Sequence, residues 1–377
     1  MKRILLTFLT WRLLLFIPVV LGSSLISYRI GYDYTNIWKF AEPYLPVSNP
    51  FLFPWANFDG VHYLSIAGYG YSNDQGFFPL YPLLIRFFAT VFGGGETFGF
   101  AYFMSGFLIA NIAFLLALFI LNKLITLDFP KKIAWKSITF LLVFPTSFFF
   151  GSLYTESLFL LLALLSFYFA RKKKWFLAGI FGMLLSATRL VGIAILPALI
   201  YEFVKEEKKL RVKALSLLLP PLGLLSYALY NFWQFGNSFL FIAAHENINP
   251  TRSVNSVILI PQTVFRYIKI LATTLGQYEW WIALLEISSF IFAATLLYAA
   301  WKKKIRLSYI IFAVLCLLVP ASSGTLSGFP RYTLIAFPIF ISLALIKNMP
   351  VKIIYTAVSI VILFLLLAFF ARGYFIA

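Results

Sequence analysis

Five long apolar runs constrain this chain more than any other feature. They cover residues 4–26, 99–121, 214–234, 280–300 and 353–371, and a helix needs about 20 such residues to cross the hydrocarbon core of a bilayer. Of the 377 residues, 62% are hydrophobic and 12% are charged, whereas soluble domains are roughly 45–50% apolar. A soluble globule of this size could not bury so much apolar surface. The sequence therefore predicts an all-α integral membrane protein, with residues 1–377 forming one multispanning domain.

Two further apolar stretches are interrupted by polar residues. Residues 137–170 contain Tyr154-Thr155-Glu156, and residues 175–204 contain Thr188-Arg189. A charge at the bilayer centre costs at least about 2.5–3.5 kcal/mol on insertion scales. We therefore expect each stretch to fold into a short helical hairpin with its polar residues at the tip. The shorter expected spans are 307–320 and 332–346.

The basic residues support this topology. With the N-terminus in the cytoplasm and both hairpins drawn, 21 of the 31 Lys and Arg residues lie on cytoplasmic segments, as the positive-inside rule requires. We predict about 11 transmembrane helices with the C-terminus outside, so most of the formal charge of +18 records insertion direction and not a nucleic-acid partner. The ten remaining basic residues are Arg12, Arg29, Lys39, Arg86, Arg189, Arg252, Arg266, Lys269, Arg331 and Arg372.

Two large segments, residues 27–98 and 236–279, are expected outside the cytoplasm. Within the first, residues 77–92 are long enough to span, but two prolines and a central Arg86 favour an amphipathic helix at the outer interface. The N-terminal apolar run is interrupted by Arg12 and no A-x-A site follows it. We therefore expect an uncleaved anchor in place of a signal peptide.

The first of these segments contains a cluster of polar and aromatic residues. Asp59, His62 and Tyr63 lie within five positions, so on a helical turn Asp59 shares a face with His62 or Tyr63. One explanation is an interfacial loop capped by Asp59, with the aromatic residues as a membrane-surface belt. The other is a sugar-binding site, since sugar rings stack on aromatic side chains while a carboxylate binds the hydroxyls.

Three more charged residues lie at the outer ends of expected spans. Glu156 and Arg189 occupy the two hairpin tips, and Arg331, followed by Tyr332, comes after the run SSGTLSGFP. A solvated turn explains Glu156 equally well and a topological anchor explains Arg331, whereas an intramembrane arginine such as Arg189 is a functional candidate by default. Two arginines near an acidic loop also suit a lipid phosphate, because guanidinium binds phosphate bidentately and stays charged.

Other chemistries have weaker signals. His245 and Glu246 could join Asp59 around a metal ion, but only two histidines in the whole chain argue against a dedicated zinc site. We therefore assign no metal ligand and leave a divalent ion open. Cys316 is the only cysteine, which excludes an intrachain disulfide.

Several motifs follow one another in a recognisable order. They are FDGVHY (58–63), IAGYGY (66–71), GFFPLYP (76–82), GSLYTESLF (151–159), SATRLVG (186–192) and, near the C-terminal spans, Arg331-Tyr332. The first three resemble the W-D-x-x-H-[FY]…I-A-x-x-G-Y…F-F-P-x-[FY]-P signature of the GPI mannosyltransferase II (PIG-V) family, with Phe58 in place of the tryptophan. The later motifs are similar to blocks that follow in the same order in that family.

This resemblance implies a GT-C glycosyltransferase with its active site on the extracytoplasmic face of the cell or endoplasmic reticulum membrane. Such an enzyme moves a hexose, commonly mannose, from a polyprenyl-phosphate donor of the dolichyl type to a hydroxyl of a lipid or glycan acceptor, and we expect inversion. Asp59 matches the essential acidic residue of the superfamily's first loop. No cofactor is implied beyond the lipid-linked sugar, and a small membrane partner subunit is left open. The residues expected to bind substrate are His62, Tyr63, Glu156, Arg189, Arg331 and Tyr332.

Two other functions are compatible with the same residues. A transporter or flippase of a lipid-linked sugar would line its path with intramembrane charges and would form no glycosidic bond. The absence of a visible inverted repeat weakens that interpretation. A non-catalytic assembly subunit would tolerate substitutions in the Asp59 loop.

Overall fold

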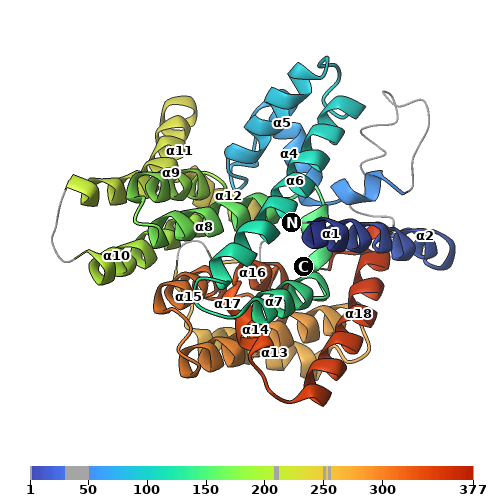
Figure 1. Ribbon diagram of the computed structural model, residues 1–377. Helices are drawn as coiled ribbons and strands as arrows, with labels where there is room; N and C mark the ends of the chain where they lie inside the picture. The colour runs from blue at the N-terminus through green and yellow to red at the C-terminus, as the bar shows by residue number, and fades with distance from the viewer. Residues whose placement is uncertain (1, 30–50, 208–211, 249–251, 254–255, 377) are drawn as a thin grey trace.

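The computed structural model describes residues 2–29, 51–207, 212–248, 252–253 and 256–376 (Figure 1). Over these residues all regular elements are helical and none is a strand, which confirms the predicted all-α class. The part of the first extramembrane segment that covers 30–50 lies outside the described residues.

Five helical segments among the described residues are long and apolar enough to cross a membrane. Each coincides with one of the five predicted runs, so the chain is a multispanning integral membrane protein. The number of 11 spans and the cytoplasmic N-terminus stay predictions. The five segments are α1 with α2 (Lys2–Leu14 and Phe16–Leu25), α6 (Phe100–Ile125), η5 with α11 (Val212–Leu218 and Leu219–Phe235), α14 (Tyr278–Lys302) and α18 (Met349–Ala371).

Arg12 lies inside the first of these segments and is buried there. Its guanidinium carbon lies 3.7 Å from the centre of the Trp55 ring and 4.8 Å from that of Phe107. A cation over an aromatic face is stabilised by the ring quadrupole. This contact stabilises a buried cation whose three guanidinium nitrogens have no hydrogen-bond partner among the described residues.

Both predicted interruptions appear as breaks between helices. Glu156 is the first residue of α8, and Arg189 lies directly before η4. The two halves of each stretch are short and pack mainly on other helices: α7 packs on α17 and α6, and α8 packs on α6 and α9. The polar residues lie at the breaks as expected, but the halves are not hairpins whose two helices pack mainly on each other. The elements of the two stretches are α7 (Lys131–Leu142), η3 (Ser147–Gly151), α8 (Glu156–Arg171), α9 (Trp175–Ser186), η4 (Leu190–Ala194) and α10 (Ile195–Glu206).

The two shorter expected spans differ from each other. Residues 307–320 form α15 (Leu307–Ala321) as predicted, whereas 332–346 is not one helix. It is divided into α16 (Phe329–Ile335) and α17 (Pro338–Ala344), because Pro338 has no backbone N–H with which to continue the helix before it. Every residue of both short helices is buried, so they belong to the protein interior.

The remaining helices belong to the two predicted extramembrane segments. In α5, Ile85 and Ala89 are fully buried while Leu83 and Phe87 are exposed, and this amphipathic pattern agrees with a helix lying at an interface. In Figure 1, α4 and α5 stand together in blue and cyan beside α6. The helices are η2 (Phe53–Ala56), α4 (Asp59–Tyr69) and α5 (Leu80–Val91) in the first segment, and α12 (Leu240–Ile248) and α13 (Ile260–Thr273) in the second.

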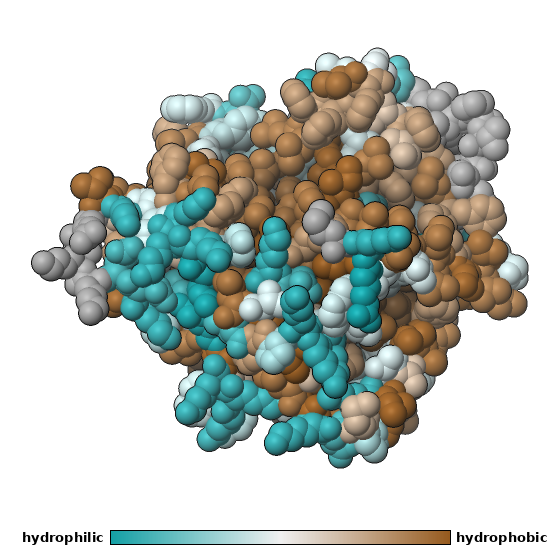
Figure 2. Space-filling view, viewed as in Figure 1, coloured by the Kyte–Doolittle hydropathy of each residue, from teal (hydrophilic) through white to brown (hydrophobic). Residues whose placement is uncertain are grey.

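The surface divides into polar and apolar areas. Figure 2 shows hydrophilic side chains gathered on one face, in the area where Figure 1 places α7, α10 and α15, with hydrophobic atoms around them. A polar patch surrounded by apolar surface is expected where helix ends leave the hydrocarbon core.

Candidate functional site

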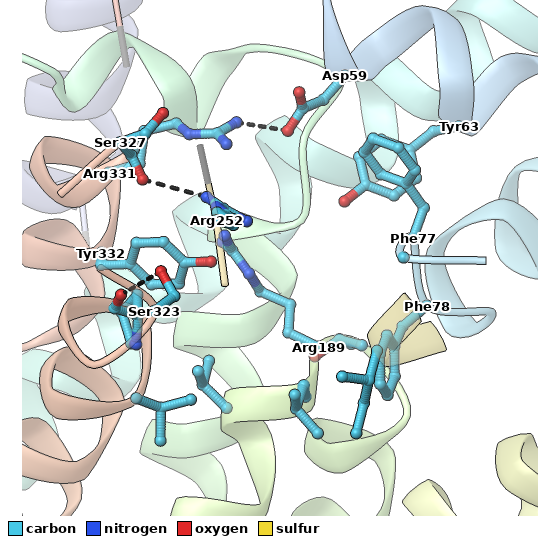
Figure 3. A pocket seen from close by; sticks show the side chains of 18 of the residues that line it. Asp59, Tyr63, Phe77, Phe78, Arg189, Arg252, Ser323, Ser327, Arg331 and Tyr332 are labelled. Carbon is cyan, nitrogen blue, oxygen red and sulfur yellow. Dashed lines mark hydrogen bonds and ion pairs between the residues drawn. The ribbon is translucent and has the colours of Figure 1, made fainter. Parts of the chain in front are cut away.

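A cavity of about 270 Å³ lies between α4, η4 and α16. Residues from four distant parts of the chain line it, and Figure 3 shows side chains on two opposite sides of the cavity. Arg331 and Tyr332 lie on one side, Tyr63 and Phe77 lie on the other, and Arg189 extends between them. The charged side chains that line the cavity in the described part of the chain are Asp59, Arg189, Arg252 and Arg331.

Asp59 and Arg331 form the first ion pair of this cavity. Asp59 is the first residue of α4, and it follows Phe58, whose φ of 60° is unusual for a residue with a side chain. Nη1 of Arg331 donates a hydrogen bond of 2.5 Å to Oδ2 of Asp59. Burial raises the pKa of Asp59, but the charge and hydrogen bond of Arg331 outweigh it, so the pKa lies below its usual value of 3.8. Asp59 is therefore a carboxylate at neutral pH.

Glu156 and Arg189 form the second ion pair. Nη1 of Arg189 donates a hydrogen bond of 2.8 Å to Oε1 of Glu156, and Nε of Arg331 lies 4.0 Å from the same oxygen. Glu156 is 1% exposed and does not line the cavity, so it connects the two arginines from behind. Its other oxygen, Oε2, and Nε of Arg331 are buried without a hydrogen-bond partner. The network is thus incomplete beside the cavity.

Two tyrosines, Tyr63 and Tyr332, lie beside the charged groups of the site. The Tyr63 hydroxyl lies 3.3 Å from Oγ1 of Thr155, and burial raises the pKa of Tyr63, so it lines the cavity in its neutral form. The ring of Tyr332 lies 4.8 Å from the guanidinium carbon of Arg189. Both side chains therefore border the charged groups.

His62 is placed differently from the other predicted residues. It does not line the cavity. Its ring stacks on Phe77 with 4.5 Å between ring centres, and its Nδ1 lies 3.9 Å from Asp74. His62 thus supports the aromatic wall from outside.

The loop before α16 is held by two buried side chains. The amide of Gly328 donates to Oε1 of Glu286 at 3.2 Å, and the hydroxyl of Tyr267 donates to Oε2 at 2.5 Å. The same hydroxyl accepts a hydrogen bond of 2.9 Å from the Leu326 amide. Because Gly328 directly precedes α16, these contacts fix the position of Arg331.

Sequence reasoning singled out seven residues for the site. Five of them line the cavity, namely Asp59, Tyr63, Arg189, Arg331 and Tyr332, whereas His62 and Glu156 do not. Sequence reasoning placed those two in the site as well. It did not assign a role to Arg252, which comes from the second extramembrane segment and also lines it. Nη2 of Arg252 donates a hydrogen bond of 3.1 Å to the carbonyl of Ser327. The one available signal was that Arg252 belongs to the ten basic residues outside the predicted cytoplasmic segments.

The sequence left open a metal site formed by Asp59 with His245 and Glu246. The side chains of His245 and Glu246 lie outside the described residues, so this combination stays untested. Within the described ranges, no group of three or more His, Cys, Asp or Glu side chains is arranged to hold a metal ion.

The fold and the cavity define a multispanning helical membrane protein with a charged pocket that is built from helix ends and loops. The chain matches the family model described as Mannosyltransferase (PIG-V) over residues 2–208. It therefore belongs to that family and is a glycosyltransferase, as its motifs indicated. Comparison with curated proteins and with solved structures gave no significant match.

Proposed function

We propose that the protein transfers mannose from a polyprenyl-phosphate donor to a hydroxyl of a lipid or glycan acceptor, with inversion, at the extracytoplasmic membrane face. The observation that carries this proposal is an ionised aspartate, Asp59, lining a cavity together with three arginines. The carboxylate suits an acceptor hydroxyl and the guanidinium groups suit a phosphate. These features agree with an enzyme of the GT-C type.

The reaction needs one proton acceptor and one stabilised leaving group. The acceptor oxygen bonds to the anomeric carbon of the sugar while the bond from that carbon to the phosphate oxygen breaks. The hydroxyl proton passes to Asp59, and the lipid leaves as polyprenyl phosphate. Attack on the face opposite the leaving group inverts the anomeric centre, as in hydrolases whose carboxylate activates the nucleophile.

The arginines would act on the leaving phosphate. Arg331 holds Asp59 through Nη1, and Arg189 is held by Glu156, so both guanidinium groups are fixed before substrate binds. Fixed charges stabilise a developing anion without having to reorganise. A general acid is unnecessary, because a phosphate with its charge neutralised is already a good leaving group.

The remaining predicted residues would position the substrates. Tyr63 and Phe77 offer aromatic surface for an apolar sugar face, and His62 supports Phe77 by stacking. Tyr332 lies beside Arg189, where it would border the phosphate.

The proposal is tested with the purified protein in lipid nanodiscs, supplied with polyprenyl-phosphate mannose carrying an isotopic label and with a membrane lipid extract as acceptor. Mass spectrometry should find the label in a new glycosidic product together with unglycosylated polyprenyl phosphate. If the same protein in sealed vesicles moves the labelled donor between leaflets and forms no new bond, it is a flippase and the proposal is wrong.

A further inference from the structure

Two arginines from distant segments converge on one glycine of the cavity. A Cβ placed on Gly328 would lie 3.6 Å from Cε2 of Tyr332, 3.7 Å from Nη2 of Arg331 and 3.8 Å from Nη2 of Arg252. Gly328 has a φ of 78°, a conformation that residues with a side chain rarely adopt. The two guanidinium tips and the edge of the Tyr332 ring therefore border the same small space, next to a residue that has no side chain to fill it.

The backbone holds Arg252 in this place. Two backbone hydrogen bonds join residues near Arg252 to the loop 322–328. The Ser253 amide donates a hydrogen bond of 2.8 Å to the carbonyl of Ser323, and the Ile258 amide donates one of 2.9 Å to the carbonyl of Ser322. Arg252 itself donates to Ser327. Figure 3 shows Arg252 among the side chains that line the cavity, with its hydrogen bond to Ser327.

The lining of the cavity is strongly cationic. Of the four charged side chains that line it in the described ranges, three are arginines. Guanidinium groups that face the same space repel each other unless an anion lies between them. A phosphate group satisfies both, because each planar guanidinium can donate two parallel hydrogen bonds to two of its oxygens.

We propose that Arg252 binds the phosphate of the lipid-linked donor jointly with Arg331, in the space above Gly328. This inference rests on the proposed function and specifies it. Arg331 then contacts both the proposed base and the leaving group, since its Nη1 donates a hydrogen bond to Asp59 and its Nη2 faces the donor phosphate. Residue 252 lies beyond the 2–208 region matched by the family model, so the donor site is completed by the part of the chain outside that match.

Arg266 provides a matched control. It comes from the same extramembrane segment and donates a hydrogen bond of 3.1 Å to the carbonyl of Gly324 in the same loop. Arg266 does not line the cavity. Arg252→Gln and Arg266→Gln thus each remove one guanidinium and a hydrogen bond to the loop 322–328, but only the first removes a proposed phosphate ligand.

The experiment measures binding of polyprenyl phosphate and of the uncharged polyprenol to wild type and to both variants in nanodiscs. We expect Arg252→Gln to weaken polyprenyl phosphate binding about tenfold or more, to leave polyprenol binding unchanged, and Arg266→Gln to stay within about twofold of wild type on both lipids. Equal losses in the two glutamine variants, or an equal loss on both lipids, would overturn the role of Arg252.

Two further comparisons keep the result decisive. If Arg252→Gln does not yield monodisperse protein, Arg252→Lys is measured in its place, with Arg266→Lys as control. Polyprenyl phosphate binding by Arg252→Lys should then weaken about threefold, because lysine keeps the charge but cannot donate two parallel hydrogen bonds. Wild type that binds polyprenol as tightly as polyprenyl phosphate would contradict the proposed function itself. Wild type that prefers the phosphate, with Arg252 variants equal to it, would contradict only the present inference.

Discussion

Two networks of arginines and carboxylates lie at opposite ends of the same helices, and they differ in completeness. Helix α8 begins at Glu156 beside the cavity and ends at Arg171, about 24 Å away along a helix of this length. The far network contains two fully hydrogen-bonded carboxylates, whereas the cavity network has buried polar atoms with no partner.

The far network joins the ends of α8 and α10 to the start of α15. Glu202 is 0% exposed, and its two oxygens accept hydrogen bonds from Arg306 and from Ser308. Arg171 donates two hydrogen bonds, of 2.6 and 2.7 Å, to the two oxygens of Asp128. Every carboxylate oxygen of Glu202 and Asp128 therefore has a partner.

The cavity network uses the same residue types differently. Oε2 of Glu156 and Nε of Arg331 have no hydrogen-bond partner, and Asp59 and Arg331 line an open space. Buried polar groups are nearly always satisfied, so the two networks differ in how fully their hydrogen bonds are formed among the described residues. The comparison teaches that the same residue types form a saturated network at one end of α8 and, at the other end, a network that borders an open cavity, which is the one we expect to act on substrate.

The largest expected effect concerns the far network and stability. Glu202→Ala removes the buried carboxylate that Arg306 and Ser308 bind and leaves the largely buried Arg306 guanidinium with Glu206 as its remaining carboxylate partner. The free energy of unfolding should fall by about 3–5 kcal/mol, measured by thermal or denaturant unfolding in detergent, while the transfer rate per folded molecule stays within about threefold. A transfer rate that collapses in the folded fraction would break the distinction between the two networks.

The next effect concerns the carboxylate at the cavity end of α8. Glu156→Gln keeps the size of the side chain but removes the charge that holds Arg189 and lies near Arg331. We expect kcat to fall about 10- to 100-fold, as for the loss of an interaction that stabilises the transition state, without an increase in the KM for the donor. A raised donor KM with unchanged kcat would instead place Glu156 in ground-state binding.

The sequence predicted the fold and much of the site for identifiable physical reasons. The five long spans could be predicted because each carries its own apolar run. Asp59, Glu156 and Arg189 stood out because charges are rare in apolar surroundings, and ordered motifs surround them. Arg252 could not be recognised, because its place depends on backbone contacts between its segment and the loop 322–328, and nothing in the local sequence encodes such a long-range contact.

The same difference applies to two helical details. The division of 332–346 follows from a single proline, Pro338, whereas the largely apolar run that predicts one span continues across it. The pairing of Arg331 with Asp59 joins residues 272 positions apart. Sequence reasoning placed both near the outer membrane surface, but their direct contact required the structure.

The third effect is a change in pH dependence. Arg331 lowers the pKa of Asp59, so the stabilisation from their ion pair is complete above about pH 3.8 and is lost as the pH falls through the lower pKa of the folded protein. In Arg331→Gln burial remains and the cation is gone. The acid limb of the transfer rate should then move to higher pH by about 1–3 units.

This shift is measured from pH–rate profiles of wild type and variant, with Arg266→Gln as a control that keeps the wild-type profile. An unchanged acid limb in Arg331→Gln would mean that Arg331 does not set the protonation of the base.

The smallest effect concerns the support of the loop before α16. Tyr267→Phe removes the hydroxyl that contacts Glu286 and the Leu326 amide. Each hydrogen bond contributes about 1 kcal/mol, so stability should fall by about 1–2 kcal/mol, and transfer should fall a few-fold through a less well-fixed Arg331. A loss as large as that of Glu156→Gln would show that this loop is part of the reacting site.

The central claim is that Asp59 accepts the proton of the acceptor hydroxyl during mannose transfer. The most direct test compares wild type and Asp59→Asn, both purified and folded to the same extent, in transfer of labelled mannose from polyprenyl-phosphate mannose. Loss of a general base should lower the transfer rate about 10²- to 10⁴-fold while polyprenyl phosphate still binds. Transfer by Asp59→Asn at the wild-type rate would contradict the role of Asp59 and, with it, the mechanism.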